Sequence, residues 1–181
     1  MHSSLWAPWR AAYLRDLASK EESAARDGAA AGDGDFLRAA WDRPDLDEPN
    51  HVVIRTADGL ILLNKFPYAN GHLLAALGDA RPTLLDYAPA QRAAFWSLVE
   101  QAVALCRRTL DPQGVNIGVN EGRAAGAGVP THLHAHVVPR WHGDTNFITV
   151  VGEVRVVPDS LEAMARAYRK VVAAGPTSSA R

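Results

Sequence analysis

Three histidines at two-residue spacing, His132, His134 and His136, constrain this chain more than any other feature. Successive side chains of a β-strand point to opposite faces, so a strand would place the three imidazoles in one row. A helix would instead scatter them around its axis. The opposite row would face the core and consists of Leu133, Ala135 and Val137. We therefore predict a strand, which should end at Pro139 or lie at a sheet edge there, because proline has no N–H for the ladder.

A row of imidazoles allows several kinds of chemistry. Near neutral pH an imidazole can act as a base, a nucleophile or a metal ligand. Three side by side can divide the work, with one attacking while its neighbours orient it and donate to an anion. The plain alternative is a solvent-exposed polar strand face, which is disfavoured because the histidines directly follow a glycine-rich loop. A metal site is the next alternative, but its third ligand would have to come from elsewhere in the chain.

Composition bounds the class of protein and its partners. The 181 residues are 48% hydrophobic and 22% charged, as expected for one globular domain with its own core. A formal net charge of −1 gives no global attraction for polyanions, so we expect no nucleic-acid partner. Cys106 is the single cysteine, which excludes an intrachain disulfide and suits a reducing, cytoplasmic location. No run approaches the roughly 20 apolar residues of a membrane span, so no membrane partner is expected.

The hydrophobic pattern predicts an α+β fold with a mostly antiparallel sheet, because strands and helices segregate without regular alternation. A short turn at 57–59 predicts a hairpin. Besides the histidine strand, strands are expected at 51–56, 60–64, 72–77 and 115–120, with 146–151 as a candidate for a further short one. Helical spacing predicts one long helix over 90–110 and a C-terminal helix over 161–173.

The chain divides into four parts. Residues 1–17 form an aromatic N-terminal segment in which we expect a short helix over 9–17. Residues 18–35, rich in alanine, glycine and acids, are expected to be a flexible connection. Residues 36–173 form the folded domain, and 174–181 are expected to be a disordered tail.

The stretch over 132–138, His-Leu-His-Ala-His-Val-Val, resembles the signature of the histidine triad (HIT) superfamily of nucleotide hydrolases and transferases. Residues 139–147 and the opening over 5–10 resemble the branch that includes bacterial diadenosine tetraphosphate phosphorylases. The resemblance covers most of residues 5–150. It implies a HIT-like fold, a nucleotide or dinucleoside polyphosphate as substrate, inorganic phosphate as a candidate second substrate, and a homodimer.

The resemblance also implies roles for the histidines. The chemistry would be displacement at phosphorus, with His134 as the nucleophile that forms a covalent nucleotidyl-histidine. The second nitrogen of His134 would donate to the main-chain carbonyl of His132, and His132 would otherwise be a supporting residue. His136 would reach the phosphate oxygens and assist the leaving group. His72 would be a further partner of the row, although it also fits a strand-end histidine with locally satisfied hydrogen bonds.

Other positions match the substrate-binding parts of the family. Main-chain amides of the loop over 120–128 are expected to bind phosphate, the alternative being a flexible hairpin loop. Relatives often have a glutamine or a serine or threonine near the end of this loop, and its absence here leaves more to the backbone. The substrate-binding candidates are Asn64, Lys65, His72, Asn120, Gly126, Ala127, Gly128, Arg140 and Trp141.

Three of these candidates have two interpretations each. Lys65 would bind phosphate or simply be solvated, whereas Asn64 is a ribose candidate. Arg140 would pair with phosphate or with a surface acid. Trp141 would stack on a purine or pack against the core.

Many relatives carry a Cys-x-x-Cys pair that helps bind zinc where this chain has Gly34, Asp35, Phe36 and Leu37. We therefore expect no metal and no other cofactor. Phosphorolysis of a dinucleoside polyphosphate is the leading function. Hydrolysis of such a compound, or of a nucleoside phosphoramidate, is the enzymatic alternative. A nucleotide-binding protein with decayed catalysis is the alternative that the missing glutamine favours, and a metalloenzyme would instead purify with stoichiometric metal.

Overall fold

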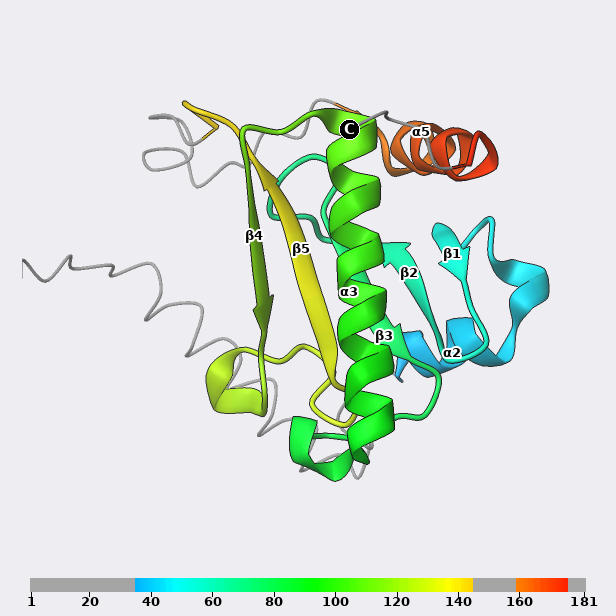
Figure 1. Cartoon of the computed structure of the whole chain (residues 1–181), viewed down its shortest axis with the longest axis vertical. Helices are drawn as coiled ribbons and strands as arrows, with labels where there is room; N and C mark the ends of the chain where they lie inside the picture. The colour runs from blue at the N-terminus through cyan, green and yellow to red at the C-terminus, as the bar shows by residue number, and fades with distance from the viewer. Residues whose placement is uncertain (1–34, 145–158, 176–181) are drawn as a thin grey trace, which may run out of the picture. The chain divides into compact units, whose positions relative to one another are not determined.

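A computed structural model describes residues 35–144 and 159–175, and an antiparallel sheet forms the centre of this part. Across the sheet the strands lie in the order β1-β2-β3-β5-β4 (Figure 1). Their bounds are Val52–Arg55 for β1, Gly59–Leu63 for β2, Leu73–Leu77 for β3, Gly114–Val119 for β4 and His134–Arg140 for β5. Every neighbouring pair is antiparallel. The predicted α+β class and its mostly antiparallel sheet are confirmed.

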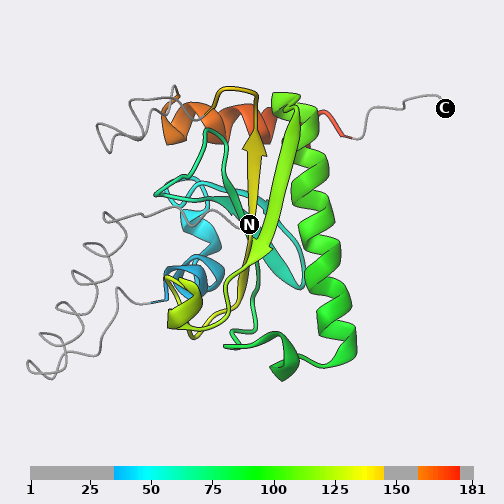
Figure 2. The same cartoon turned by 90° about the vertical axis from the view of Figure 1, so that its left-hand side faces the viewer.

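The helix α3 (Pro89–Leu110) covers one face of the sheet (Figures 1 and 2). Its start is held by the Ala88 N–H, which donates to the Gln91 side chain at 3.0 Å. Its end is marked by Asp111 in the left-handed region, with φ of 44°. Spacing of three and four residues brings one stripe of α3 onto the sheet, as the sequence predicts. The stripe consists of Phe95, Leu98, Val99, Ala102, Leu105 and Cys106, all buried.

The helix α5 (Leu161–Ala173) begins at Ser160, whose hydroxyl accepts the Ala163 N–H at 3.2 Å, and its bounds agree with the prediction. Its buried Tyr168 donates its hydroxyl to the Gly71 carbonyl at 2.7 Å. Gly71 has φ of 76°, and a β-carbon there would lie 2.3 Å from the Leu110 side chain. The turn into β3 therefore requires glycine at this position.

The helix α2 (Phe36–Asp42) lies on the opposite face of the sheet (Figure 2). Asp35 is its N-cap residue and accepts the Arg38 N–H at 2.9 Å. At its other end Arg55 donates to the carbonyls of Ala40 and Trp41. Seven residues are too few for a helical period to be recognised, and the sequence analysis does not predict this helix. A second, smaller core lies beneath it and consists of Leu37, Ala40, Val52, Leu60, Leu62, Leu74 and Ala76.

One expectation about the histidine strand needs correction. The strand β5 begins at His134, so His132 precedes it in a bend. Of the two expectations for Pro139, the strand end and the sheet edge, the second holds, because the strand continues to Arg140. Pairing with β3 stops at Val137, so in the described part Pro139 is paired only with β4 and the missing N–H is tolerated.

Short 3₁₀ turns complete the described part, at η1 (Pro44–Leu46), η2 (Leu84–Asp86) and η3 (Arg123–Ala125). No helix of the described residues is long and apolar enough to cross a membrane. The helix predicted over 9–17 and the strand predicted over 146–151 lie outside the described residues.

Candidate active site

The ring of His134 is oriented by a main-chain carbonyl. Its Nδ1 lies 2.8 Å from the carbonyl oxygen of His132, which can only accept. Nδ1 therefore carries the hydrogen, and Nε2 is the nitrogen with the lone pair. The side chain is almost fully buried, with 4% exposed. This is the arrangement of a neutral imidazole prepared to act as a nucleophile through Nε2.

His136 has the opposite tautomer, which follows from its contact with His72. The Tyr68 N–H donates to His72 Nδ1 at 3.1 Å, so the hydrogen of the neutral His72 ring is on Nε2. His72 Nε2 lies 3.0 Å from His136 Nδ1 and donates to it. His136 therefore carries its own hydrogen on Nε2 and can donate it to an anion. Both interpretations of His72 describe part of this arrangement, because its Nδ1 has local partners and its Nε2 contacts the histidine row.

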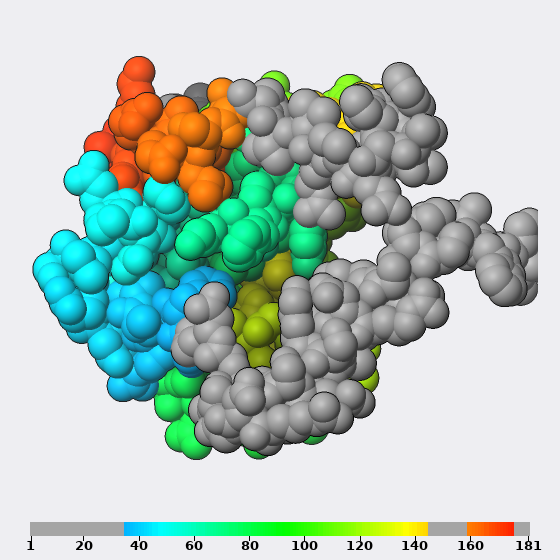
Figure 3. All heavy atoms as spheres, turned by 180° about the vertical axis from the view of Figure 1, so that it is seen from behind, coloured from blue at the N-terminus to red at the C-terminus, as the bar shows by residue number. Residues whose placement is uncertain are grey.

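Pairing of β3 with β5 brings these groups together. Ala76 is opposite His134 and Leu74 is opposite His136, so both imidazoles lie on the face of the sheet that α2 partly covers. The ring centroids of His134 and His136 are 5.1 Å apart. Figure 3 looks onto this side of the molecule, where yellow-green atoms are visible beside the blue atoms of α2. The opposite row, Leu133, Ala135 and Val137, lies in the main core as predicted.

Burial keeps the two reacting rings neutral. Desolvation lowers the pKa of His134, and the hydrogen bond to the His132 carbonyl opposes that shift. Desolvation and the neighbouring His134 together lower the pKa of His136 to about 4. At neutral pH one ring thus presents a lone pair and the other an N–H.

His132 belongs to the supporting structure. Its side chain is buried, with Nδ1 2.8 Å from the Asp35 carboxylate and Nε2 2.7 Å from the Leu77 carbonyl oxygen. Both nitrogens face acceptors, so both donate and neither is directed to a substrate. Asp35, which is predicted to lie in the flexible connection over 18–35, is thus in contact with the histidine row.

Tyr68 was not identified from the sequence. Its ring lies nearly parallel to that of His136, with centroids 5.7 Å apart and an interplanar angle of 18°. It is also 4.8 Å from the His72 ring. Its side chain remains half exposed, so it borders the site at the His136 side. The residues around Tyr68 predict a turn, and only the folded structure shows its ring contact with His136.

Asn64 supports His72 in this structure. Its side-chain amide lies 3.3 Å from His72 Nδ1, and its carbonyl oxygen accepts the Phe66 N–H at 2.9 Å. Its expected contact with ribose therefore remains a prediction. Lys65 is exposed next to it.

The loop over 120–128 is internally hydrogen bonded. The amides of Gly126 and Ala127 donate to the carbonyls of Arg123 and Gly122, at 2.9 and 3.2 Å. These two N–H groups are thus engaged within the loop, which leaves them less suited to bind phosphate than expected. Asn120 makes a long contact of 3.5 Å to the Gly126 carbonyl. Gly128 is exposed, and a β-carbon there would meet nothing within 4 Å.

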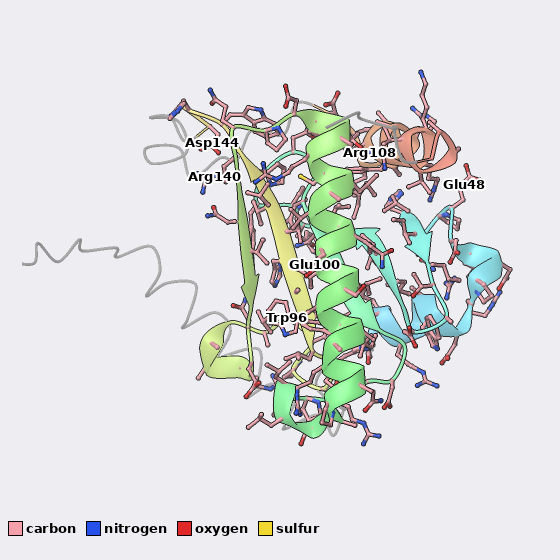
Figure 4. The ribbon with its side chains drawn as sticks, in the orientation of Figure 1. Glu48, Trp96, Glu100, Arg108, Arg140 and Asp144 are labelled. Carbon is pink, nitrogen blue, oxygen red and sulfur yellow. The ribbon has the colours of Figure 1, made fainter. Side chains whose placement is uncertain are left out.

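The other end of β5 carries a different arrangement. Arg140 donates to both carboxylate oxygens of Asp144, at 2.6 and 2.8 Å, and to the Asn116 side chain at 2.9 Å (Figure 4). Of the two interpretations of Arg140, the structure shows the pairing with a surface acid. Trp141 is partly buried but lies outside both core clusters. Its expected base stacking remains a prediction.

Among the described residues, no group of three His, Cys, Asp or Glu side chains is arranged to hold a metal ion. The row itself does not fit a metal, because both nitrogens of His132 face other acceptors and His136 Nδ1 faces His72. We therefore derive no chemistry through a metal.

Comparison with known proteins decides the family. The family model described as "HIT domain" matches residues 45–143, which include all of β1 to β5. The chain belongs to the HIT domain family. It is 34% identical to a protein named AP-4-A phosphorylase from Mycobacterium tuberculosis, over 87% of this chain and 77% of that protein. It is also 30% identical to an asymmetrical bis(5'-nucleosyl)-tetraphosphatase of Schizosaccharomyces pombe, over 52% of each chain.

Solved structures agree with this assignment. A Zn-bound histidine triad family protein from Mycobacterium smegmatis is 28% identical, with a TM-score of 0.62 over 77% of this chain and 93% of that one. A histidine triad nucleotide-binding protein from Sulfolobus tokodaii, at 21% identity and a TM-score of 0.61, supports the fold alone. The resemblance read from the histidine row, and with it the expectation of a HIT-family enzyme, is confirmed.

Proposed function

We propose that this HIT-family protein transfers a nucleotidyl group from a dinucleoside polyphosphate through a covalent intermediate on His134. The observation that carries the proposal is the opposite tautomers of two rings whose centroids are 5.1 Å apart. His134 has a lone pair on Nε2, and His136 has an N–H on Nε2. A nucleophile beside a donor is what displacement at phosphorus requires.

In the first step a bond forms between His134 Nε2 and the α-phosphorus, and the bond from phosphorus to the bridging oxygen breaks. The electron pair goes to that oxygen, and the leaving polyphosphate is stabilised by the His136 N–H. The His134 ring becomes positively charged but keeps its Nδ1 hydrogen on the His132 carbonyl. In the second step an acceptor oxygen attacks phosphorus, and His134 leaves as a neutral imidazole.

The acceptor distinguishes the two candidate reactions. The relative named AP-4-A phosphorylase favours inorganic phosphate as the acceptor, which makes diadenosine tetraphosphate the substrate to test first. The relative named bis(5'-nucleosyl)-tetraphosphatase supports water as the acceptor, and hydrolysis is the second candidate. Lys65, Asn120 and Gly128 are the residues we propose for the phosphate chain.

The test is to incubate the full chain with diadenosine tetraphosphate, with and without labelled inorganic phosphate. Phosphorolysis yields ATP and ADP, with the label in ADP, and no turnover without phosphate. Release of AMP without phosphate would overturn phosphorolysis and favour the hydrolase. Rapid quenching should trap an adenylyl group on His134, and binding without any adduct or turnover would favour a protein with decayed catalysis.

We propose further that two copies pair through α3 and β4 and act in the cytoplasm. The strand β4 lies at one end of the sheet order, and its Ile117 is 50% exposed. On α3, Trp96 is 43% exposed (labelled in Figure 4). Light scattering should give twice the chain mass, and Ile117→Lys should shift the protein to monomer. A monomeric wild-type chain would contradict the pairing.

A further inference from the structure

We propose that Asp35 is a positioning residue for His134, acting through a buried ion pair with His132. The ion pair would fix the one carbonyl oxygen that receives the His134 Nδ1 hydrogen. The catalytic part of this inference rests on the proposed function, whereas the ion pair itself can be tested without any substrate.

The main-chain position of His132 explains why it needs such an anchor. The strand β5 starts at His134, so the His132 carbonyl is not part of the strand pairing that fixes the rest of the row. The His132 N–H makes only a turn contact of 3.2 Å to the Val129 carbonyl. The peptide unit that carries the His132 carbonyl is held on its other side, where the Leu133 N–H donates to the Arg81 carbonyl at 2.7 Å. The His132 side chain adds two contacts of similar length, to Asp35 at 2.8 Å and to the Leu77 carbonyl at 2.7 Å.

Those contacts also define the charge state of the His132 ring. A carbonyl oxygen and a carboxylate cannot donate, so an imidazole between them donates from both nitrogens and is an imidazolium. Asp35 is the counter-ion, with both carboxylate oxygens within 3.0 Å of Nδ1. The His132 side chain is fully buried and that of Asp35 is 20% exposed, so the two charges hold each other in a region with little water.

The ion pair also connects the row to α2. Asp35 is the N-cap of that helix, and the same carboxylate accepts a hydrogen bond from the Arg38 N–H. A single residue, 97 positions away in sequence, thus joins the start of one helix to the residue that orients the nucleophile. The loss of the carboxylate would leave a buried imidazolium without a partner, and the ring would lose its proton or move.

The helix cap and the ion pair can be separated by substitution. Asn and Ser are both good N-cap residues, so Asp35→Asn and Asp35→Ser retain the cap. Asn can still reach His132, and its amide can donate to a neutral ring. Ser is too short to do so. Asp42→Asn is the matched control, because Asp42 lies on the same helix but pairs with the exposed Arg38 side chain.

The first readout is the ¹⁵N spectrum of the imidazoles in the full chain without substrate. In the wild type at pH 7, His132 should show two protonated nitrogens and His134 a single Nδ1–H tautomer. In Asp35→Ser, His132 should lose one proton and His134 should show mixed tautomers. A neutral His132 in the wild type, or an unchanged His134 in Asp35→Ser, would overturn the inference.

The second readout is turnover of diadenosine tetraphosphate. We expect kcat to fall on the order of tenfold in Asp35→Ser and about threefold in Asp35→Asn, with KM within twofold of wild type in both. Asp42→Asn should retain full turnover. Equal kcat in Asp35→Ser and Asp42→Asn would reduce Asp35 to a helix cap. If the wild type turns over no substrate at all, the proposed function fails, and the spectrum alone decides the ion pair.

Discussion

The two faces of the sheet are built for opposite purposes. Beneath α3 the sheet packs against apolar side chains, and the two buried tyrosines there each donate their hydroxyl to a main-chain carbonyl. On the α2 face the apolar core is smaller. The buried polar residues of the described part are three histidines, His72, His132 and His134. One face supplies stability through area removed from water, and the other holds hydrogen-bonded rings whose protons are individually assigned.

The largest expected effect is the loss of chemistry at unchanged stability. His134→Asn removes the nucleophile, yet its amide can still donate to the His132 carbonyl. Turnover should fall to the detection limit, while nucleotide affinity stays within a few-fold and Tm within a few degrees of wild type. Isothermal titration and thermal melting check affinity and stability. If His134→Asn turns over substrate as fast as the wild type, His134 is not the nucleophile.

The α3 face should show the reverse. Phe95→Ala empties a fully buried position in the main core, and such truncations cost about 3–5 kcal/mol. Urea unfolding measures this loss. The folded fraction of Phe95→Ala should have the same KM as wild type. A changed KM would show that the two faces of the sheet are not independent.

His136→Asn tests the donor within the histidine face. Loss of a general acid or equivalent donor lowers rate by about 10²–10⁴-fold. The loss should be smaller for a substrate with a better leaving group, such as a nitrophenyl ester of AMP, because that group needs less assistance. Equal losses for both substrates would place His136 away from the leaving oxygen.

Lowering the pH should reduce the free energy of unfolding through the buried histidines. The pKa of His136 in the folded protein is about 4, below the ordinary value of 6.5, so the unfolded chain binds a proton that the folded protein does not. Stability therefore falls as pH drops from 6.5 towards 4. The depressed pKa of His134 acts in the same direction. Urea midpoints between pH 7.5 and 5 should fall less steeply in His136→Asn, and parallel curves would contradict the shift.

The smallest effect is expected at Tyr68. Stacking of one aromatic ring on another contributes about 0.5–1.5 kcal/mol, so Tyr68→Leu should lower kcat/KM by no more than about tenfold. Phe66→Leu is the matched control, since Phe66 is 75% exposed in the same turn. Identical losses in both variants would mean that the contact with His136 contributes nothing specific.

Sequence periodicity predicts the long helices and the strand β5, but it does not predict the contacts between them. The helix over 161–173 follows from apolar spacing, because burial sets that spacing. The strand β5 follows from the two-residue spacing of its histidines. The short helix α2 has only seven residues and leaves no recognisable period. The strand order, which brings His72 beside His136, also lies beyond a local pattern.

Site chemistry divides in the same way. The spacing of the histidines places His134 and His136 on one face, and the resemblance names the His132 carbonyl as the acceptor of His134. The direction of the His72–His136 hydrogen bond depends on a main-chain N–H at Tyr68, which no residue pattern encodes. Likewise, Asp35 meets His132 only through folding, and the pairing of Arg140 with Asp144 depends on the turn that brings this acid beside it.

The phenol of Tyr168 has a consequence for how small this catalyst can be. The region that matches the family model ends at residue 143, well before α5, yet Tyr168 supports the glycine that directly precedes His72. A chain truncated after residue 158 would keep every histidine but would lose the hydrogen bond that holds the turn before His72. The contacts that hold this turn therefore extend 25 residues beyond the end of the match, and the neighbouring Arg169 also donates to the Val52 carbonyl.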